Sequence, residues 1–258
     1  MNQATEVLRP QHTSLMVKLA DKTDEIEQVL RLRYKVFVEE TANHLLRNDF
    51  RLERDRYDDY CDHIIVKNQD LDRVVGTYRL LPGGRAVQNI GFYSETEFNL
   101  SSFPADKKQI LELGRSCIDA DYRNGKAIQM LWEGIAGYMS EHGFQYLIGC
   151  ASLHIDCRQS LNEIYTILKR KEIITDRFGV TPLDTHRIEG LQEITLNVGE
   201  KEVFRRLPPL MKGYQWLGAE IGGDPAYDKL FDSTDFFIVL QTERVARRYR
   251  RHFLDNKR

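Results

Sequence analysis

The chain has few cysteines, no long apolar run and no large excess of charge, and each shortage excludes a class of protein. Its four cysteines, Cys61, Cys117, Cys150 and Cys157, are widely spaced and follow no signal-like segment. We therefore expect reduced thiols in a cytoplasmic protein and no cysteine-based metal site. No run of about 18 apolar residues occurs, which excludes a membrane-spanning helix but leaves peripheral contact with a membrane open. The formal net charge of −2 gives no reason to expect nucleic acid as a partner.

What the chain does have is enough apolar material for one large domain, or for one domain with an extension. Hydrophobic residues make up 41% of the 258 positions and aromatic residues 10%, which is enough to bury a substantial core. The periodicity of the apolar residues predicts both strands and helices. The predicted strands cover residues 14–21, 63–68, 73–82, 109–118 and 144–152, and the predicted helices cover residues 24–40 and 127–142.

This order of elements favours an α+β fold with a mostly antiparallel central sheet flanked by helices. The polar connection between the second and third strands suits a hairpin, so these strands should pair antiparallel. Thr23 or Asp24 is the expected N-cap of the first helix. We assign the domain to residues 14–240, with a core at 14–155 and an elaboration at 156–240, followed by a basic C-terminal helix at 241–258.

The segment ILELGRSCI, residues 110–118, places Glu112 and Arg115 inside a stretch that otherwise has the pattern of a buried strand. Glu and Arg are rarely buried unless they are paired. The two charges therefore indicate either a structural ion pair at a strand end or the floor of a functional cleft. Gly114 lies between them, and a glycine within a strand often marks a β-bulge that splays its neighbours apart.

A cluster of acidic residues follows the first predicted helix. The segment DRYDDYCDH holds Asp55, Asp58, Asp59 and Asp62. As a solvated loop the cluster needs no function, whereas as a site it would hold an amine or a cationic amino acid. Its spacing is not that of a calcium-binding loop, and we predict no metal. Arg79, on a strand that should adjoin the Glu112 strand, is either an exposed strand residue or a partner for an acidic group.

Three further segments carry weaker signals. Residues 122–131, YRNGKAIQML, open a predicted helix with glycine and basic residues, where exposed N–H groups and the helix dipole favour phosphate. Residues 207–228 combine proline and glycine with apolar side chains, which indicates a shaped loop region that borders an acyl-chain tunnel or covers the core. The C-terminal segment predicts a basic amphipathic helix that suits an anionic protein or an anionic lipid surface. Its arginines are Arg244, Arg247, Arg248, Arg250 and Arg251.

Taken in chain order, these motifs resemble the GNAT-type N-acyltransferases that make lyso-ornithine lipid. The first half of the chain also resembles the acyl-homoserine-lactone synthases. The motifs are RYKVFVEE, DRYDDYCDH, VVGTYRLL, GFYSETEF, ILELGRSCI, YLIGCAS and PPLMKGYQWLGA, within residues 30–240. The resemblance implies a GNAT-like fold and transfer of a fatty acyl group, typically 3-hydroxylated, from acyl carrier protein to the α-amine of L-ornithine. That reaction is the first step of ornithine lipid synthesis, and it implies no resident cofactor.

The resemblance also implies a set of site residues. The functional set of the acyl-homoserine-lactone synthases falls here on Arg33, Phe37, Asp58, Arg79, Glu112 and Arg115, and its second acidic position falls on Asp59 or Asp62. The tryptophan that those synthases carry after the first helix is missing, which argues against S-adenosylmethionine as the acceptor. The C-terminal motifs PPLMKGYQWLGA and STDFFIVL resemble the ornithine-lipid enzymes and not the synthases.

The donor loop departs from the usual GNAT pattern. Enzymes of this type that use coenzyme A hold its pyrophosphate on a Q/R-x-x-G-x-G/A loop, and the similar stretch here begins with Tyr122. A carrier protein brings a phosphopantetheine arm without the adenosine pyrophosphate, so a partly degraded loop is what the resemblance implies. The residues it assigns to that arm are Arg123, Asn124, Gly125 and Lys126. The basic tail would then dock the acidic carrier protein or an anionic inner-membrane surface.

Attack on a thioester needs a neutral amine, whereas the α-amine of ornithine is largely protonated at neutral pH. Glu112 is our candidate general base, with burial as the means of tuning its pKa. Alternatively, Arg115 holds Glu112 ionised and weakly basic, and Glu112 mainly orients the amine. Backbone N–H groups after Gly114 would meet the oxyanion. The acidic residues would neutralise the cationic acceptor, and Arg33 or Arg79 would pair with its carboxylate.

Two other functions fit the same motifs. One is an N-acyl amino acid synthase with a different acceptor, such as glycine, which a competition assay between acceptors would separate. The other is a non-catalytic protein that binds acyl carrier protein or a membrane on the same scaffold, in which Glu112 is structural. Carrier-protein binding without turnover would support it.

Overall fold

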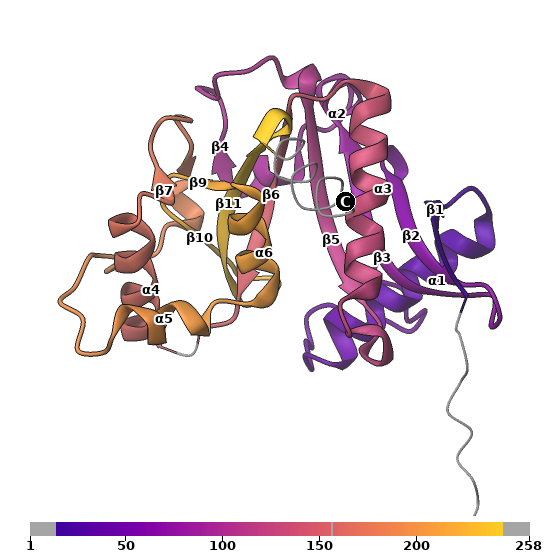
Figure 1. Cartoon of the computed structure of the whole chain (residues 1–258), viewed down its shortest axis with the longest axis horizontal. Coiled ribbons are helices and arrows are strands. Elements are labelled where there is room, and N and C mark those ends of the chain that lie inside the picture. The colour runs from indigo at the N-terminus through magenta and orange to yellow at the C-terminus, as the bar shows by residue number, and fades with distance from the viewer. Residues whose placement is uncertain (1–13, 156, 245–258) are drawn as a thin grey trace, which may run out of the picture.

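The computed structural model describes residues 14–155 and 157–244. Within these residues the strands form one mixed sheet in the order β1-β2-β3-β5-β6-β11-β9-β7, with β10 also paired to β11 (Figure 1). Its strands are β1 (Leu15–Leu19), β2 (Asp62–Asn68), β3 (Arg73–Pro82), β5 (Ile110–Ile118), β6 (Tyr146–Leu153), β7 (Ile174–Thr175), β9 (Glu220–Gly222), β10 (Ala226–Asp228) and β11 (Ser233–Gln241). A separate two-stranded pair joins β4 (Phe98–Asn99) to β8 (Thr181–Pro182).

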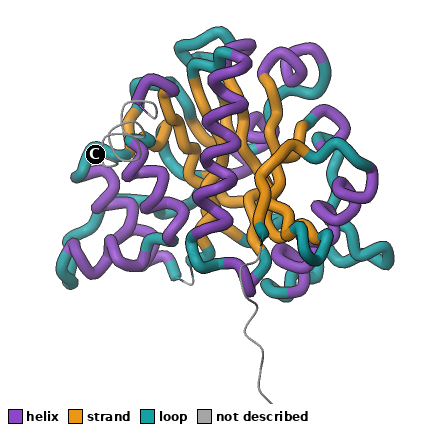
Figure 2. The backbone as a smooth tube through the Cα atoms, turned by 45° about the vertical axis from the view of Figure 1, so that its right-hand side comes forward, coloured by secondary structure: helices purple, strands orange, loops and turns teal. Residues whose placement is uncertain are grey.

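Helices pack around these strands (Figure 2). They are α1 (Thr23–Tyr34), α2 (Gly83–Gln88), α3 (Lys126–His142), α4 (Arg158–Arg170), α5 (Glu200–Arg206) and α6 (Pro209–Leu217). No helix in the described part of the chain is both long enough and apolar enough to cross a membrane. The predicted α+β fold is therefore confirmed, with helices that flank a largely antiparallel sheet.

Helices α1 and α3 cover opposite faces of the sheet. Strand side chains alternate between the two faces, so the neighbours Ile64 and Ile65 on β2 point in opposite directions. Ile64 packs in the core cluster that contains Leu131 of α3. Ile65 packs in the cluster that contains Val29 of α1. A functional residue on a strand can thus be assigned to the α1 face or the α3 face from its place in the alternation.

Two predicted elements differ from the structure. The first helix begins at Thr23 with Lys22 as N-cap and no side-chain cap bond, so neither Thr23 nor Asp24 is the N-cap. It continues beyond Tyr34 as a π-helical turn, Lys35–Glu39. The region predicted to be a shaped loop instead contains α6. Its prolines are compatible with a helix because Pro209 lies in the first turn, where the N–H that proline lacks would have no partner within the helix. Gly218 ends α6 with a left-handed φ of 90°.

The sheet opens between its two central strands. β5 and β6 run parallel and pair only from Ile110 to Glu112 on β5. Beyond that point β5 stays paired with β3 as far as Ile118, and β6 stays paired with β11. At the start of the opening, position 149 on β6 requires glycine, because a Cβ there would lie only 2.3 Å from the carbonyl oxygen of Leu113. The two strands therefore diverge at Glu112, which places that residue at the edge of the opening.

Candidate active site

A cavity of about 910 Å³ lies where β5 and β6 separate, and both faces of the sheet contribute to its wall. On β5, Ile110 belongs to a cluster on the α1 face and Leu113 to the core on the α3 face. Alternation then places Glu112 on the α1 face. The wall on this face is largely polar. On the α3 face it is largely apolar and includes Trp132 of α3 and Leu210 of α6.

Glu112 is held at the edge of the cavity by a turn from another part of the chain. The backbone N–H of Tyr93 donates to its Oε2 at 2.7 Å, and the backbone N–H and hydroxyl of Ser94 donate to its Oε1 at 2.7 and 2.6 Å. Glu112 is 4% exposed. Burial raises the pKa of Glu112, against the opposing effect of the bonds from Ser94 and Tyr93. A buried carboxyl that lines the cavity, with a raised pKa, fits the predicted general base.

A β-bulge turns Arg115 onto the same face as Glu112. Arg79 on β3 lies opposite Gly114 and Thr77 lies opposite Cys117, so β5 carries an extra residue between these pairs. Arg115 accommodates it with a left-handed φ of 49°. Its guanidinium lies 4.6 Å from the centre of the Tyr93 ring. The bulge predicted from Gly114 is therefore present, and it cancels the alternation that would have sent Arg115 to the opposite face.

Behind this wall lies a buried group of paired charges centred on Arg33. Its guanidinium binds Glu53 and makes two hydrogen bonds to Asp58, at 2.6 and 3.1 Å. Arg33 is 0% exposed and does not line the cavity. Burial opposes ionisation of Asp58, but the charges of Arg33 and Arg79 hold its pKa well below the usual range. The structure therefore does not present Arg33 to an acceptor carboxylate.

Arg79 and Arg115 extend the same network to the cavity wall. Arg79 Nη1 lies 2.6 Å from Asp55 Oδ1 and 3.2 Å from Asp58 Oδ1. Arg115 lies 3.1 Å from Glu53 Oε1 through Nε and 2.8 Å from Asp55 Oδ2 through Nη2. Three guanidinium groups are thus matched by three carboxylates. Arg115 pairs with these acids and not with Glu112, so the predicted Glu112–Arg115 ion pair is not the arrangement of the structure.

The predicted acidic residues are separated by the fold. Asp59 is 61% exposed and pairs with Arg54, and it does not line the cavity. Asp62 binds Arg85 at 2.9 and 3.1 Å and accepts a hydrogen bond from Tyr138 at 2.6 Å, also away from the cavity. Neither is therefore placed to neutralise an acceptor.

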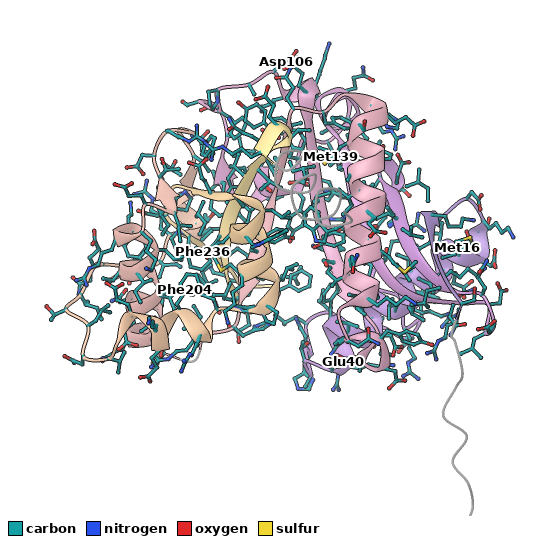
Figure 3. All side chains as sticks on the ribbon, viewed as in Figure 1. Met16, Glu40, Asp106, Met139, Phe204 and Phe236 are labelled. Carbon is teal, nitrogen blue, oxygen red and sulfur yellow. The ribbon has the colours of Figure 1, made fainter. Side chains whose placement is uncertain are left out.

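Phe37 and part of the predicted donor loop do reach the cavity. Phe37 lies edge-on to Phe231, with ring centres 6.0 Å apart, and both residues line the wall. In the loop before α3, Arg123 and Gly125 line the wall, whereas Asn124 and Lys126 do not. Arg123 pairs with Glu40 at 2.6 Å, and Figure 3 shows Glu40 below the lower end of α3. The predicted C-terminal basic helix lies outside the described residues apart from its first four positions, 241–244.

Other acidic residues near the cavity were not predicted from the sequence. Glu53 completes the arginine network together with Asp55, which the acidic cluster of DRYDDYCDH already included, and the alternating charges of RLERDRYDDY were the only signal for Glu53. On the other side, Asp228 and Asp235 line the wall, and Glu97 lies behind Asp235. Glu97 and Asp235 lie within two motifs that carried the resemblance, GFYSETEF and STDFFIVL, but no chemistry had been assigned to them.

Comparison with known proteins shows which class of fold this is. Residues 32–133 match the family model described as "Acetyltransferase (GNAT) domain". A solved structure of a CoA-dependent acyl-homoserine lactone synthase, BjaI, is similar over 92% of this chain and 89% of its own, with a TM-score of 0.56 and 16% identity. The fold is therefore that of the GNAT acyltransferases, as the motifs implied.

Comparison with curated proteins identifies a narrower family within the GNAT acyltransferases. The chain is 33% identical to an L-ornithine N(alpha)-acyltransferase of Brucella abortus (strain 2308), over 92% of this chain and 87% of the relative. It is 34% identical to an enzyme of the same name from Rhodobacter capsulatus, over 93% and 95% of the two chains. The chain belongs to the family of the L-ornithine N(alpha)-acyltransferases. The family resemblance stated from the motifs is thereby confirmed.

Proposed function

We propose that this protein transfers a fatty acyl group, typically 3-hydroxylated, from acyl carrier protein to the α-amine of L-ornithine, as the first step of ornithine lipid synthesis. Its family supports the acceptor, because the curated relatives are named for it. The observation that carries the proposal is a single cavity with a polar wall at Glu112 and an apolar wall between α3 and α6. Such a cavity admits a charged amino acid on one face of the sheet and an acyl chain on the other.

In the proposed reaction the nitrogen of the neutral α-amine attacks the thioester carbonyl. A C–N bond forms, the C–S bond breaks and the phosphopantetheine thiolate leaves, to be reprotonated as a thiol. Glu112 accepts the proton lost by nitrogen, directly or through one water molecule, because its carboxylate lines the cavity and burial raises its pKa. Backbone N–H groups at the bulge after Gly114 receive the negative charge of the tetrahedral oxygen.

Binding would be divided between the two ends of the cavity. Arg79 and Arg115 line the polar wall, and an acceptor carboxylate would bind the N–H groups that their bonds to Glu53, Asp55 and Asp58 leave unused. Arg123 and Gly125, at the start of α3, would meet the phosphate of the donor arm, aided by the dipole of this 17-residue helix. The donor thioester brings its own carrier, so the proposal needs no resident cofactor. The arginine-rich tail would dock acyl carrier protein or an anionic inner-membrane surface.

The experiment is a competition between acceptors and between donors. Purified protein is incubated with 3-hydroxyacyl carrier protein or 3-hydroxyacyl-CoA and an equimolar mixture of free amino acids, and products are identified by mass spectrometry. The expected result is N-acyl-ornithine as the dominant product, formed faster from the carrier protein. Acylation of another amino acid, such as glycine, would overturn the acceptor. Binding of acyl carrier protein with no product from either donor would favour a non-catalytic protein.

A further inference from the structure

Charge does not balance on the β11 side of the cavity. The three arginines of the site are matched by Glu53, Asp55 and Asp58. On the other side, Glu97, Asp228 and Asp235 are 1%, 6% and 2% exposed. Within the described residues, no Lys, Arg or His forms an ion pair with any of these three carboxyls. Buried acidic groups are rarely left without a cation, so this group lacks a counter-charge that the described residues do not supply.

Three separate elements bring these carboxyls together. Asp235 lies on β11, and Phe237, two residues later, packs on the α1 face, so Asp235 points to the same face as Glu112. Glu97 follows the turn that holds Glu112, and Asp228 ends β10. Carboxylate oxygens of Glu97 and Asp235 and the sulfur of Cys150 lie within 4.8 Å of one another. Asp228, Asp235 and Cys150 all line the cavity.

Glu97 is the member with no donor group of its own. Both of its side-chain oxygens are buried and accept no hydrogen bond from an amide, a hydroxyl or a cation of the described residues, and the neighbour that interacts with them is the Asp235 carboxyl. Asp228, by contrast, accepts from the backbone N–H groups of Leu230 and Phe231, and Asp235 accepts from the hydroxyl of Ser233 at 2.7 Å. Burial, with the charges of Asp235 and Asp228, raises the pKa of Glu97 to about 9. A carboxyl in this state retains a proton until a cation arrives to take its place.

Resting on the proposed function, we propose that Glu97, Asp228 and Asp235 bind the side-chain ammonium of the acceptor. They would thereby select a diamino acid over a neutral amino acid of the same length. Once an arriving cation displaces the retained proton, the carboxyls supply an excess of negative charge in a buried setting, where an ammonium group gains most from pairing. An ammonium group also offers three donors to acceptors that surround it. Glu97 provides two oxygens that accept from no amide, hydroxyl or cationic group of the described residues.

The acidic cluster lies close enough to Glu112, the proposed base, for a short aliphatic chain to connect the two. The hydroxyl of Ser94 lies 2.6 Å from Glu112 Oε1 and 3.5 Å from the sulfur of Cys150. Cys150 in turn belongs to the cluster with Glu97 and Asp235. One layer of side chains thus separates the group that would take the α-amine proton from the carboxyls that would hold the terminal ammonium. Ser94 and Cys150 line the cavity between Glu112 and Asp235, so the three methylenes of ornithine would lie along this wall with the α-amine at Glu112.

A divalent metal ion is the competing occupant, because two carboxylates and a thiol are possible ligands. Thiols bind metal as thiolates. Burial and the charges of Glu97 and Asp235 raise the pKa of Cys150 well above its ordinary value, which disfavours the thiolate. An ammonium ion requires no change at Cys150. We therefore infer that the cluster binds an organic cation, and the experiment below also measures whether it binds a metal ion.

The test compares L-ornithine with L-norvaline, which has the same carbon chain without the terminal amine. Acyl transfer and calorimetric binding are measured for wild type, Glu97→Gln and Asp235→Asn. Asp176→Asn, at a position that is 88% exposed and does not line the cavity, is the matched control. Wild type is expected to prefer ornithine by at least about 100-fold in kcat/KM. Each cluster variant should reduce that preference at least about 10-fold by raising KM for ornithine more than KM for norvaline.

Several outcomes would overturn the assignment. These are equal use of the two acceptors by wild type, a preference unchanged in folded Glu97→Gln and Asp235→Asn, or equal losses for both acceptors. One equivalent of a divalent metal in purified wild type, lost in Glu97→Gln, would give the cluster to a metal. Calorimetry separates this inference from the proposed function. Ornithine binding that weakens in Glu97→Gln supports the cluster even without turnover, whereas acylation of ornithine with unchanged preference rejects the cluster alone.

Discussion

Glu112 and Arg115 lie three residues apart on the same face of β5, but their side chains serve different partners. Glu112 accepts three hydrogen bonds from Tyr93 and Ser94, while Arg115 binds Glu53 and Asp55. Without a bulge, residues three apart on a strand would point to opposite faces. The bulge therefore places the Glu112 carboxyl on the same face as the Arg115 guanidinium, although the two do not form an ion pair. Arg115 consequently does not hold Glu112 in its ionised form through a direct contact.

Replacing Glu112 with Gln should remove the proton acceptor and lower kcat about 10²- to 10⁴-fold. The amide would also set an N–H donor against the N–H of Tyr93 or Ser94, at a cost of about 1–3 kcal/mol in unfolding free energy. Single-turnover acyl transfer at saturating ornithine measures the first effect and urea unfolding the second. A folded Glu112→Gln protein with wild-type kcat would reject Glu112 as the base.

Ser94→Ala should shift the pH dependence without removing the base. The base must be ionised, so activity rises as pH increases through its pKa. The Ser94 hydroxyl donates to the ionised carboxylate at 2.6 Å, and its loss should raise the pKa of Glu112 further. We expect the acid limb of kcat/KM to move to higher pH. Thr96→Ala is the matched control, because its hydroxyl bonds within the same turn, to the Tyr93 carbonyl, and does not touch Glu112. An acid limb that moves equally in both variants would assign the effect to the turn.

The sequence was informative where a pattern is local. Alternating apolar residues gave the strand at residues 73–82 with the bounds of β3, and Gly114 indicated the bulge on β5. Neither feature depends on knowing which distant segment lies nearby. The choice of partner does depend on it. Asp58 and Asp59 are adjacent acidic residues in one short turn, yet one faces Arg33 in the core and the other faces solvent.

The same limit explains why the second acidic cluster was missed. Glu97 and Asp235 come from distant parts of the chain and meet only because β11 pairs with β6 and the turn at residues 93–96 lies against β6. In the sequence Glu97 lies beside Glu95 and Thr96, and Asp235 follows Asp232, Ser233 and Thr234, a polar context that is typical of surface positions. Only the fold shows that both are buried and that, within residues 14–155 and 157–244, no basic side chain pairs with them.

Asp58→Asn should destabilise the fold strongly, because it leaves the fully buried Arg33 with one of its two anionic partners removed. We expect a loss of about 3–5 kcal/mol in unfolding free energy. Asp59→Asn, at an exposed surface pair, should change it by less than about 0.5 kcal/mol. The folded pKa of Asp58 is depressed, so its contribution is complete above the ordinary carboxyl range near pH 4 and is lost as pH falls toward the folded pKa. Similar urea midpoints for the two variants would contradict the proposed importance of the network.

Gly213 on α6 offers a way to test the apolar wall. It lines the cavity, and a Cβ at this position would meet no atom within 4 Å, so a larger side chain would project into free space without a clash. Gly213→Leu should therefore obstruct long acyl chains and lower kcat/KM for a 16-carbon donor about 10-fold more than for a 4-carbon donor, with KM for ornithine unchanged. Gly137→Leu is the matched control, because Gly137 also has open space and a helical setting, on α3, but does not line the cavity. Both changes favour the helix to a similar extent. If Gly213→Leu slowed both donors equally, or if Gly137→Leu showed the same chain-length bias, the acyl chain would have to lie elsewhere.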